Sequence, residues 1–258
     1  MGFHIDAACV CNKGLIRSNN EDNFFFFGKI LPYNNSGTNG IITLQEDIMP
    51  EMTACVFDGI GGGEYGEIAS YTAAKSTQNY LSNNPYTDYE SVWDYLEGYV
   101  NCLNVDVVSK AEQLTADTMG STMVSLHFIE NSAYICNLGD SKCFRFSDGN
   151  LIQLSDDHTD GEFLASNGIV NRKPSLIQYL GINPRELMIE PSIKKIPLNR
   201  KEQFLLCSDG LTDMVPPSSI KACLNERKSA ARCVEELLTY ALNGGGKDNI
   251  TIMVCKIR

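Results

Sequence analysis

The sequence is short of positive charge, of histidine and of long apolar runs, and the first and the last of these shortages each argue against a class of protein. It has 21 Lys and Arg against 32 Asp and Glu, which gives a net charge of −11. This balance argues against a protein that binds a nucleic-acid backbone, because such a protein needs a basic face. It does not exclude a small phosphorylated ligand, since metal ions can invert the local field of an acidic pocket. The longest apolar runs fall far below the ~18 residues of a membrane-spanning helix.

Several catalytic motifs are also missing. There is no Gly-x-Ser-x-Gly nucleophile motif, and Cys207 is not followed by the Cys-x5-Arg loop of a cysteine phosphatase. Of the three histidines, His4 lies near the terminus and His127 in the middle of an expected strand, so we expect structural roles for both. A structural role is also expected for His158, but this residue lies in an acidic stretch and is the histidine most worth testing.

The ten cysteines do not form a recognisable disulfide or zinc pattern. There is no Cys-x-x-Cys pair and no Cys/His spacing suited to zinc. Six of the ten lie in or beside apolar, strand-like runs, as small buried side chains do in a reducing compartment. The first residues contain no basic segment followed by an apolar one, so no signal peptide is expected. We therefore expect a cytoplasmic protein.

The pattern of apolar residues predicts an α+β fold in one domain. The chain is 43% hydrophobic and 21% charged, which is ordinary for a globular protein, and we find neither a repeat nor a dividing linker in residues 1–258. Helix pairs alternate with blocks of strands joined by hairpin-like turns, which favours layered antiparallel sheets over a parallel sheet. The expected strands are 3–11, 24–27, 41–44, 53–57, 122–129, 132–138, 142–146, 151–154, 192–197, 203–207 and 249–257, and the expected helices are 67–81, 89–114, 156–168, 216–224 and 229–242.

The stretch 53–63 is the most informative in the chain. An apolar strand ends at Asp58, and glycines follow it. Glycine lets the backbone turn and its carbonyls approach a ligand, and hard cations bind carboxylate and carbonyl oxygens. A lone Asp-Gly pair is usually only a turn. However, other strand ends also carry acids, at Glu21-Asp22, Asp209 and Asp248.

Three carboxylates in one place would repel each other and raise each other's pKa, and divalent metal ions would relieve that repulsion. Two such ions about 3.5–4 Å apart can hold a water for in-line attack on phosphorus. Arg17 lies close in sequence to the first acidic pair, and a guanidinium suits bidentate binding of phosphate. An isolated Arg in a turn would ordinarily be only a solvated surface charge.

Eight motifs, taken together and in order, resemble those of the metal-dependent serine/threonine phosphatases of the type-2C (PPM) family over almost the whole chain. They are Gly14-x-x-Arg17-x-x-Asn20-Glu21-Asp22, Val56-x-Asp58-Gly59-x-Gly61-Gly62, Gly66-x-x-Ala69-Ser70, Met119-Gly120-Ser121-Thr122, Asn137-x-Gly139-Asp140-Ser141, Gln153-Leu154-x-x-Asp157-His158, Leu206-x-Ser208-Asp209-Gly210-Leu211-x-Asp213 and Gly246-Lys247-Asp248-Asn249-Ile250-Thr251.

The resemblance implies a four-layer αββα sandwich, in which helix pairs flank two antiparallel sheets, with two Mn²⁺ or Mg²⁺ ions at one end. By matching position, Asp58 would bridge both ions and the Gly59 carbonyl would bind one of them. Asp209 and Asp248 would bind the other. The implied reaction is hydrolysis of phosphoserine or phosphothreonine in proteins by a metal-bridging hydroxide.

The resemblance also implies supporting roles for further residues. Glu21 would hold a metal-bound water, Asp22 would orient the metal ligands, and Arg17 would bind the substrate phosphate. Asp117 matches a position for a weaker third metal, shared with Asp209 and with Asp213. The implied partners are proteins that a Ser/Thr kinase has phosphorylated, and neither nucleic acid nor a membrane is expected as a partner. The chain is expected to be a monomer.

Three departures from the family pattern affect these expectations. Ile60 stands where animal members of the family have His, and bacterial-type members also have an apolar residue there. This speaks against a histidine general acid at that position. The family's Arg-Ala-Leu-Gly stretch appears as 178–181 without the Arg. The segment 166–175 is short for the family's flap, which helps choose substrates.

Two alternatives remain open from the sequence alone. One is a catalytically inactive relative that serves as a binding module, which the retention of Asp58, Asp209 and Asp248 disfavours. The other is a two-metal phosphoesterase that acts on small phosphate esters or nucleotides.

Overall fold

The computed structural model describes residues 2–49, 51–60, 65–169 and 171–258, and its strands form two antiparallel sheets. A six-stranded sheet has the order β3-β1-β11-β10-β7-β8, and a five-stranded sheet has the order β2-β4-β5-β6-β9. The first is built from β1 (His4–Asn12), β3 (Ile42–Asp47), β7 (Lys142–Ser147), β8 (Asn150–Gln153), β10 (Gln203–Cys207) and β11 (Ile250–Ile257). The second is built from β2 (Asp22–Phe26), β4 (Glu51–Asp58), β5 (Met123–Ile129), β6 (Ser132–Leu138) and β9 (Ser192–Pro197).

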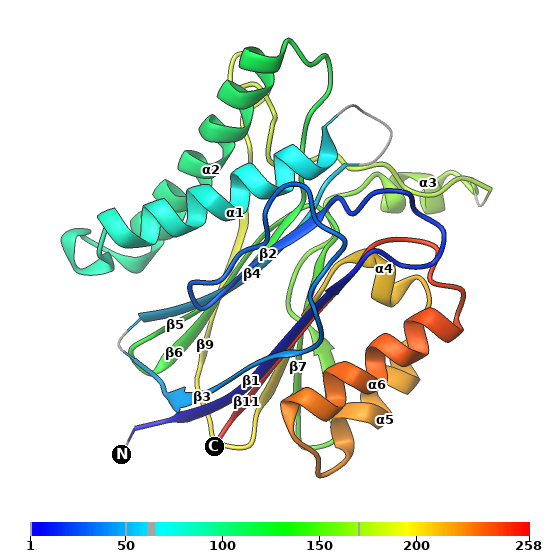
Figure 1. Cartoon of the computed structure of the whole chain (residues 1–258). Coiled ribbons are helices and arrows are strands. Elements are labelled where there is room, and N and C mark those ends of the chain that lie inside the picture. The colour runs from blue at the N-terminus through cyan, green and yellow to red at the C-terminus, as the bar shows by residue number, and fades with distance from the viewer. Residues whose placement is uncertain (1, 50, 61–64, 170) are drawn as a thin grey trace.

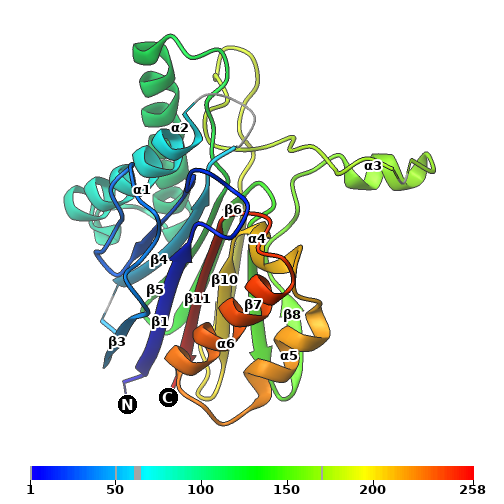
Figure 2. The same ribbon diagram turned by 45° about the vertical axis from the view of Figure 1, so that its right-hand side comes forward.

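Helix pairs cover the outer faces of both sheets (Figure 1). The long helices α1 (Gly66–Asn83) and α2 (Val92–Leu114) pack on the five-stranded sheet, and α5 (Pro217–Asn225) and α6 (Ala230–Asn243) pack on the other. The short helix α3 (Gly161–Ser166) projects away from the sheets (Figure 2). A 3-10 turn, η1 (Tyr86–Asp88), joins α1 to α2. The predicted αββα sandwich is therefore confirmed.

Burial on both faces explains why the central strands read as continuous apolar runs. In β1, Ile5, Ala7 and Cys9 point into the core between the sheets, whereas Ala8 and Val10 point into the core beneath α5 and α6. A third core lies between the five-stranded sheet and the helices α1 and α2. None of the described helices has the length and apolar character needed to cross a bilayer.

The structure differs from the sequence prediction in two short segments. The helix expected over 156–168 is limited to Gly161–Ser166. A four-residue helix, α4 (Asp209–Thr212), follows β10 in a segment for which no helix was predicted. One helical turn is too short to show a period of 3.6 residues in the sequence. The glycine-rich turn expected after Asp58 falls mainly on residues 61–64, which lie outside the described residues.

Candidate active site

Strand ends from both sheets meet at the end of the sandwich opposite the two chain termini (Figure 1). Asp58 is the last residue of β4 and faces Asp22, the first residue of β2, in the strand register. Asp209 begins α4 directly after β10, and Asp248 lies just before β11. A cleft of about 160 Å³ lies here, lined by Arg17, Glu21, Asp58, Gly59, Ile60, Thr122, Asp140, Lys173, Pro174, Leu176, Asp209 and Asp248.

The backbone around Asp58 is held by residues 121–122. The Ser121 hydroxyl donates to the Asp58 carbonyl at 3.0 Å, and the Thr122 N–H donates to the same oxygen at 2.8 Å. The Gly59 N–H donates to the Glu21 carbonyl at 3.1 Å. A Cβ at Gly59 would lie 2.3 Å from the Gly66 carbonyl oxygen, so only glycine fits here. The position of Asp58 is therefore fixed by neighbouring backbone on two sides.

Asn249 fixes the loop that carries Arg17 and Glu21. Its side-chain amide donates to the carbonyls of Lys13 and Asn19, each at 2.9 Å. Its side-chain oxygen accepts from the Glu21 N–H at 2.7 Å. Asn249 belongs to one of the sequence motifs, but no role was predicted for it. Its role depends on a contact with residues more than 200 positions earlier, which the sequence does not reveal.

Asp22 is buried next to the cleft, and within the described chain only one of its two carboxylate oxygens is hydrogen-bonded. One carboxylate oxygen accepts from the Ser208 and Thr251 hydroxyls at 2.8 and 2.7 Å. The other oxygen is buried and has no hydrogen-bond partner among the described residues. Burial, opposed by these two hydrogen bonds and reinforced by the charge of Asp209, raises the pKa of Asp22 to about 7. The cleft thus holds more negative charge than its protein surroundings neutralise.

The raised pKa values of two more carboxyls, Asp58 and Asp140, indicate the same excess of negative charge in the cleft. Burial raises the pKa of Asp58 well above its ordinary value, and the charges of Asp22 and Asp209 raise it further. Burial, together with the charge of Asp209, raises the pKa of Asp140 to about 6. Asp140 was missed as a site residue, although it follows β6 through Gly139 much as Asp58 ends β4. The position of an acidic residue just after a buried strand could have identified Asp140 from the sequence.

Two cations reach the acids of the cleft. The Arg17 guanidinium bonds Asp248 Oδ2 at 2.7 Å. Lys173 Nζ lies 2.7 Å from Asp209 Oδ2 and 3.0 Å from Asp213 Oδ2. Sequence reasoning missed Lys173, because residues 166–175 carried no motif. Among the described residues, no group of three or more His, Cys, Asp or Glu side chains is arranged to hold a metal ion.

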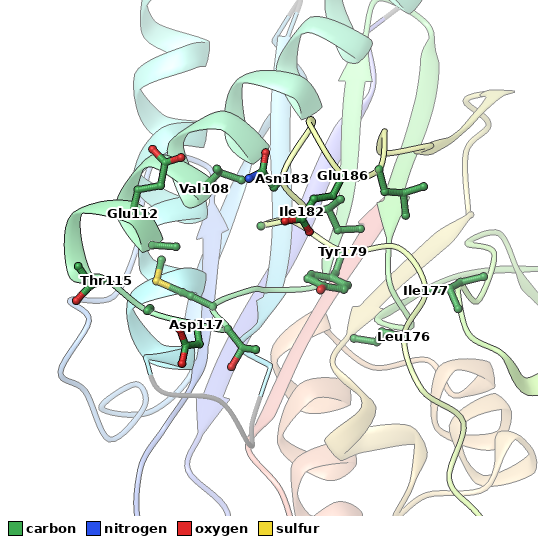
Figure 3. A pocket seen from close by; sticks show the side chains of 16 residues that line it. Val108, Glu112, Thr115, Asp117, Leu176, Ile177, Tyr179, Ile182, Asn183 and Glu186 are labelled. Carbon is green, nitrogen blue, oxygen red and sulfur yellow. The ribbon is translucent and has the colours of Figure 1, made fainter.

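Of the predicted third-metal residues, Asp209 lines this cleft, but Asp117 and Asp213 do not. Asp213 contacts it only through Lys173, which it shares with Asp209. Asp117 lines a different cleft, between the end of α2 and residues 176–187 (Figure 3). A third metal site at these residues stays a prediction.

The three histidines have other contacts and do not line the cleft. His4 pairs with Asp47, and His127 is buried between the hydroxyls of Thr53 and Ser125. Burial lowers the pKa of His127 to about 3, so it stays neutral. His158 accepts from the Gly139 N–H at 3.3 Å and contacts the Ser192 hydroxyl, which is a structural role.

The donor set of the cleft suits hard divalent cations. Every candidate ligand is a carboxylate or a backbone carbonyl, which are the donors that Mg²⁺ and Mn²⁺ prefer. The unsatisfied buried oxygen of Asp22 and the raised pKa values of Asp58 and Asp140 indicate a site that added positive charge would stabilise.

Comparisons with known proteins agree with this geometry. The family model "Protein phosphatase 2C" matches residues 46–242. Serine/threonine phosphatase stp of Listeria welshimeri is 27% identical over 253 residues, covering 94% of this chain and 92% of the relative. PstP of Mycobacterium tuberculosis is 26% identical over 97% of this chain and 44% of the relative. A crystal structure of the PstP catalytic domain with two manganese ions superposes with a TM-score of 0.76 at 24% identity, covering 99% of both chains. The chain therefore belongs to the protein phosphatase 2C family of serine/threonine phosphatases.

Proposed function

We propose that this chain hydrolyses phosphoserine and phosphothreonine in proteins at the cleft around Asp58, using two Mn²⁺ or Mg²⁺ ions. The observation that carries the proposal is the meeting of Asp58, Asp209, Asp248 and Arg17 in one cleft, although they lie up to 231 positions apart. The two manganese ions in the related PstP structure support the choice of metal.

The residues that would hold the cations are those expected from the sequence. Asp58 and the Gly59 carbonyl would serve one ion, and Asp58, Asp209 and Asp248 the other. Glu21 lines the same cleft and would hold a water, as its position beside Asp248 allows. When bound, the two ions would supply Lewis acidity toward the phosphoryl oxygens and lower the pKa of water.

The chain's own groups do the positioning. Asp22 lies opposite Asp58 in the β2–β4 pair and is held by Ser208 and Thr251, so its charge supports the cations without facing the substrate. Arg17 and Lys173 are the two side-chain cations that line the described part of the cleft, and both can turn from a carboxylate to the substrate phosphate. A guanidinium can bind two phosphate oxygens at once.

A third, weaker metal at Asp117 and Asp213, together with Asp209, remains part of the proposal. It requires Asp213 to leave Lys173 and an ion to lie between the two clefts. Metal titration of an Asp117→Asn variant would test this assignment.

Further proposals concern the chain as a whole. We propose that residues 1–258 act as one catalytic domain, supported by β1 and β11, which lie centrally in one sheet although they fall outside the family match. All ten cysteines are free thiols, which supports a reducing, cytoplasmic location. Action as a monomer also remains a proposal. Reversal of a Ser/Thr kinase follows from the substrate class.

The function is tested by Mn²⁺-dependent turnover of p-nitrophenyl phosphate beside a phosphothreonine peptide. We expect turnover of both, abolished by a chelator and restored by Mn²⁺. Turnover of nucleotides without turnover of the peptide would favour a phosphoesterase of small esters. No turnover of either would favour a binding module.

Arg17→Ala should raise KM by about tenfold or more, because a charge-assisted hydrogen bond contributes about 1.5–3 kcal/mol. The turnover number kcat should change much less, since Arg17 would bind phosphate in both the ground and the transition state. Steady-state kinetics on the phosphothreonine peptide measure both constants. Arg232→Ala on the exposed face of α6 is the control, and it should change neither. A loss confined to kcat would contradict the assigned role.

A further inference from the structure

A second, larger cleft adjoins the catalytic cleft. It has a volume of about 490 Å³ and lies between the C-terminal part of α2 and the segment 176–187. Figure 3 shows Glu112 and Thr115 on the α2 side, and Ile182, Asn183 and Glu186 on the opposite side. Leu176 lines both clefts, so the two are neighbours across one side chain.

The two clefts share a fixed framework. The buried Asn104 of α2 donates to the Ile182 carbonyl at 2.9 Å and accepts from the Gly181 N–H at 2.8 Å. Leu180 and Ser121 exchange two backbone hydrogen bonds, both of 2.9 Å. Ser121 in turn holds the Asp58 carbonyl. The wall of the larger cleft is therefore tied to the backbone of Asp58, so a ligand bound there would have a defined position relative to Asp58.

The lining of the larger cleft combines negative charge with exposed apolar surface. It contains the carboxylates of Glu112, Asp117 and Glu186, and no Lys or Arg is among its described lining residues. Within the described chain, none of the three carboxylates forms an ion pair. Ile177 and Leu187 line it with 52% of their surfaces exposed. Such a surface complements a ligand with both a basic and an apolar side chain.

The smaller cleft leaves the rest of a protein substrate without a site. Its volume of about 160 Å³ is suited to a phosphoryl group and little more. Residues on either side of a phosphorylated Ser or Thr must therefore lie outside it, and the larger cleft is the neighbouring hollow that Leu176 joins to it.

We propose that the larger cleft binds the segment of the phosphoprotein next to the phosphorylated residue, and that it selects substrates with a Lys or Arg and a bulky apolar residue there. Glu112 and Glu186 attract the basic side chain, and Ile177, Leu187 and Tyr179 contact the apolar one. The proposal rests on the proposed phosphatase function, because it names the substrates of that same site.

The test compares phosphothreonine peptides that differ only beside the phosphorylated residue. One peptide carries Arg and Leu on the N-terminal side of the phosphothreonine, and a second carries them on the C-terminal side. Each is paired with a matched peptide that has Ala at these two positions. For the unaltered chain we expect one Arg-Leu peptide to exceed its Ala partner in kcat/KM by about tenfold, as electrostatic complementarity of an exposed site allows. In the double variant Glu112→Lys, Glu186→Lys this preference should disappear, with p-nitrophenyl phosphate turnover unchanged.

The control is Glu97→Lys, the same charge reversal on the same helix. Glu97 is exposed and lies 15 residues before Glu112, or about 22 Å along an α-helix. It should leave the preference intact. A double variant that keeps the preference, or an unaltered chain that treats all the peptides alike, would overturn the proposal.

The failure of the proposed function can be recognised separately. If neither peptides nor p-nitrophenyl phosphate are turned over with Mn²⁺, the phosphatase assignment fails. Fluorescence anisotropy of the same labelled peptides in EDTA then still tests the cleft. Weaker binding of the Arg-Leu peptide to the double variant than to the unaltered chain would support it, and equal binding would overturn it.

Discussion

Asp58→Asn should lower phosphatase turnover by about 10³-fold or more, because metal ions supply several kcal/mol of transition-state stabilisation and each 1.36 kcal/mol is tenfold in rate. Asp58 is the one carboxylate expected to bind both ions. The amide keeps the size of the side chain but has no charge with which to bridge them. The measurement is kcat with saturating Mn²⁺ on a phosphothreonine peptide. Asp148→Asn in the exposed turn between β7 and β8 is the matched control and should keep full activity.

The same substitution should not destabilise the metal-free fold. Burial and the neighbouring Asp22 and Asp209 raise the pKa of Asp58 in the folded chain. A carboxyl with a raised folded pKa binds its proton more tightly when folded, so its contribution to stability is lost as the pH rises through that pKa. At neutral pH the Asp58 carboxyl therefore lowers the stability of the metal-free fold, and the neutral amide of Asn removes this unfavourable contribution. Thermal unfolding in EDTA at pH 7 should give a Tm no lower than that of the unaltered chain. Near-normal turnover, or an unfolded variant, would contradict the assigned role of Asp58.

Gly210→Ala should destabilise the fold and remove most activity. A Cβ at Gly210 would lie 1.9 Å from the Asn249 carbonyl oxygen and 2.9 Å from its carbon. Alanine favours a helix over glycine by about 1 kcal/mol. That gain cannot offset a backbone collision, since even milder overpacking costs about 1–3 kcal/mol. Because Asp209 and Asp248 flank the two segments that would separate, the metal ligands would move with them.

Urea unfolding of the Gly210→Ala variant should show a loss of about 2 kcal/mol or more, with the larger effect on turnover. Gly161→Ala, also at the start of a short helix, is the control. Its Cβ would meet nothing closer than the Thr159 hydroxyl at 3.2 Å, a group that can rotate. A Gly210→Ala variant with ordinary stability and activity would show that α4 and Asn249 are not held as closely as described.

The sequence predicted the layers because local patterns carry them. Hairpin turns such as 148–150 and apolar runs such as 250–257 each specify a strand and its neighbour without knowledge of distant contacts. The convergence of Asp58, Asp209 and Asp248 was also predicted, because each acid follows or precedes a buried strand and the family motifs occur in order. The structure brings all three to one cleft.

What the sequence did not reveal depends on contacts between segments far apart in the chain. Lys173 meets Asp209 across 36 positions from a stretch without a motif, and Asn249 reaches Lys13 across 236. The position of Asp117 on the wall of a second cleft depends on how residues 176–187 pack against α2, which Asn104 determines. Neither side-chain pairing of this kind nor a cleft leaves a periodic signal in the sequence.

The most direct test of the central claim is anomalous diffraction from crystals grown with Mn²⁺. The proposal predicts two manganese ions in the cleft, about 3.5–4 Å apart, with Asp58 between them and Asp209 and Asp248 on one of the two. No manganese in the cleft, or manganese bound away from Asp58, would contradict it.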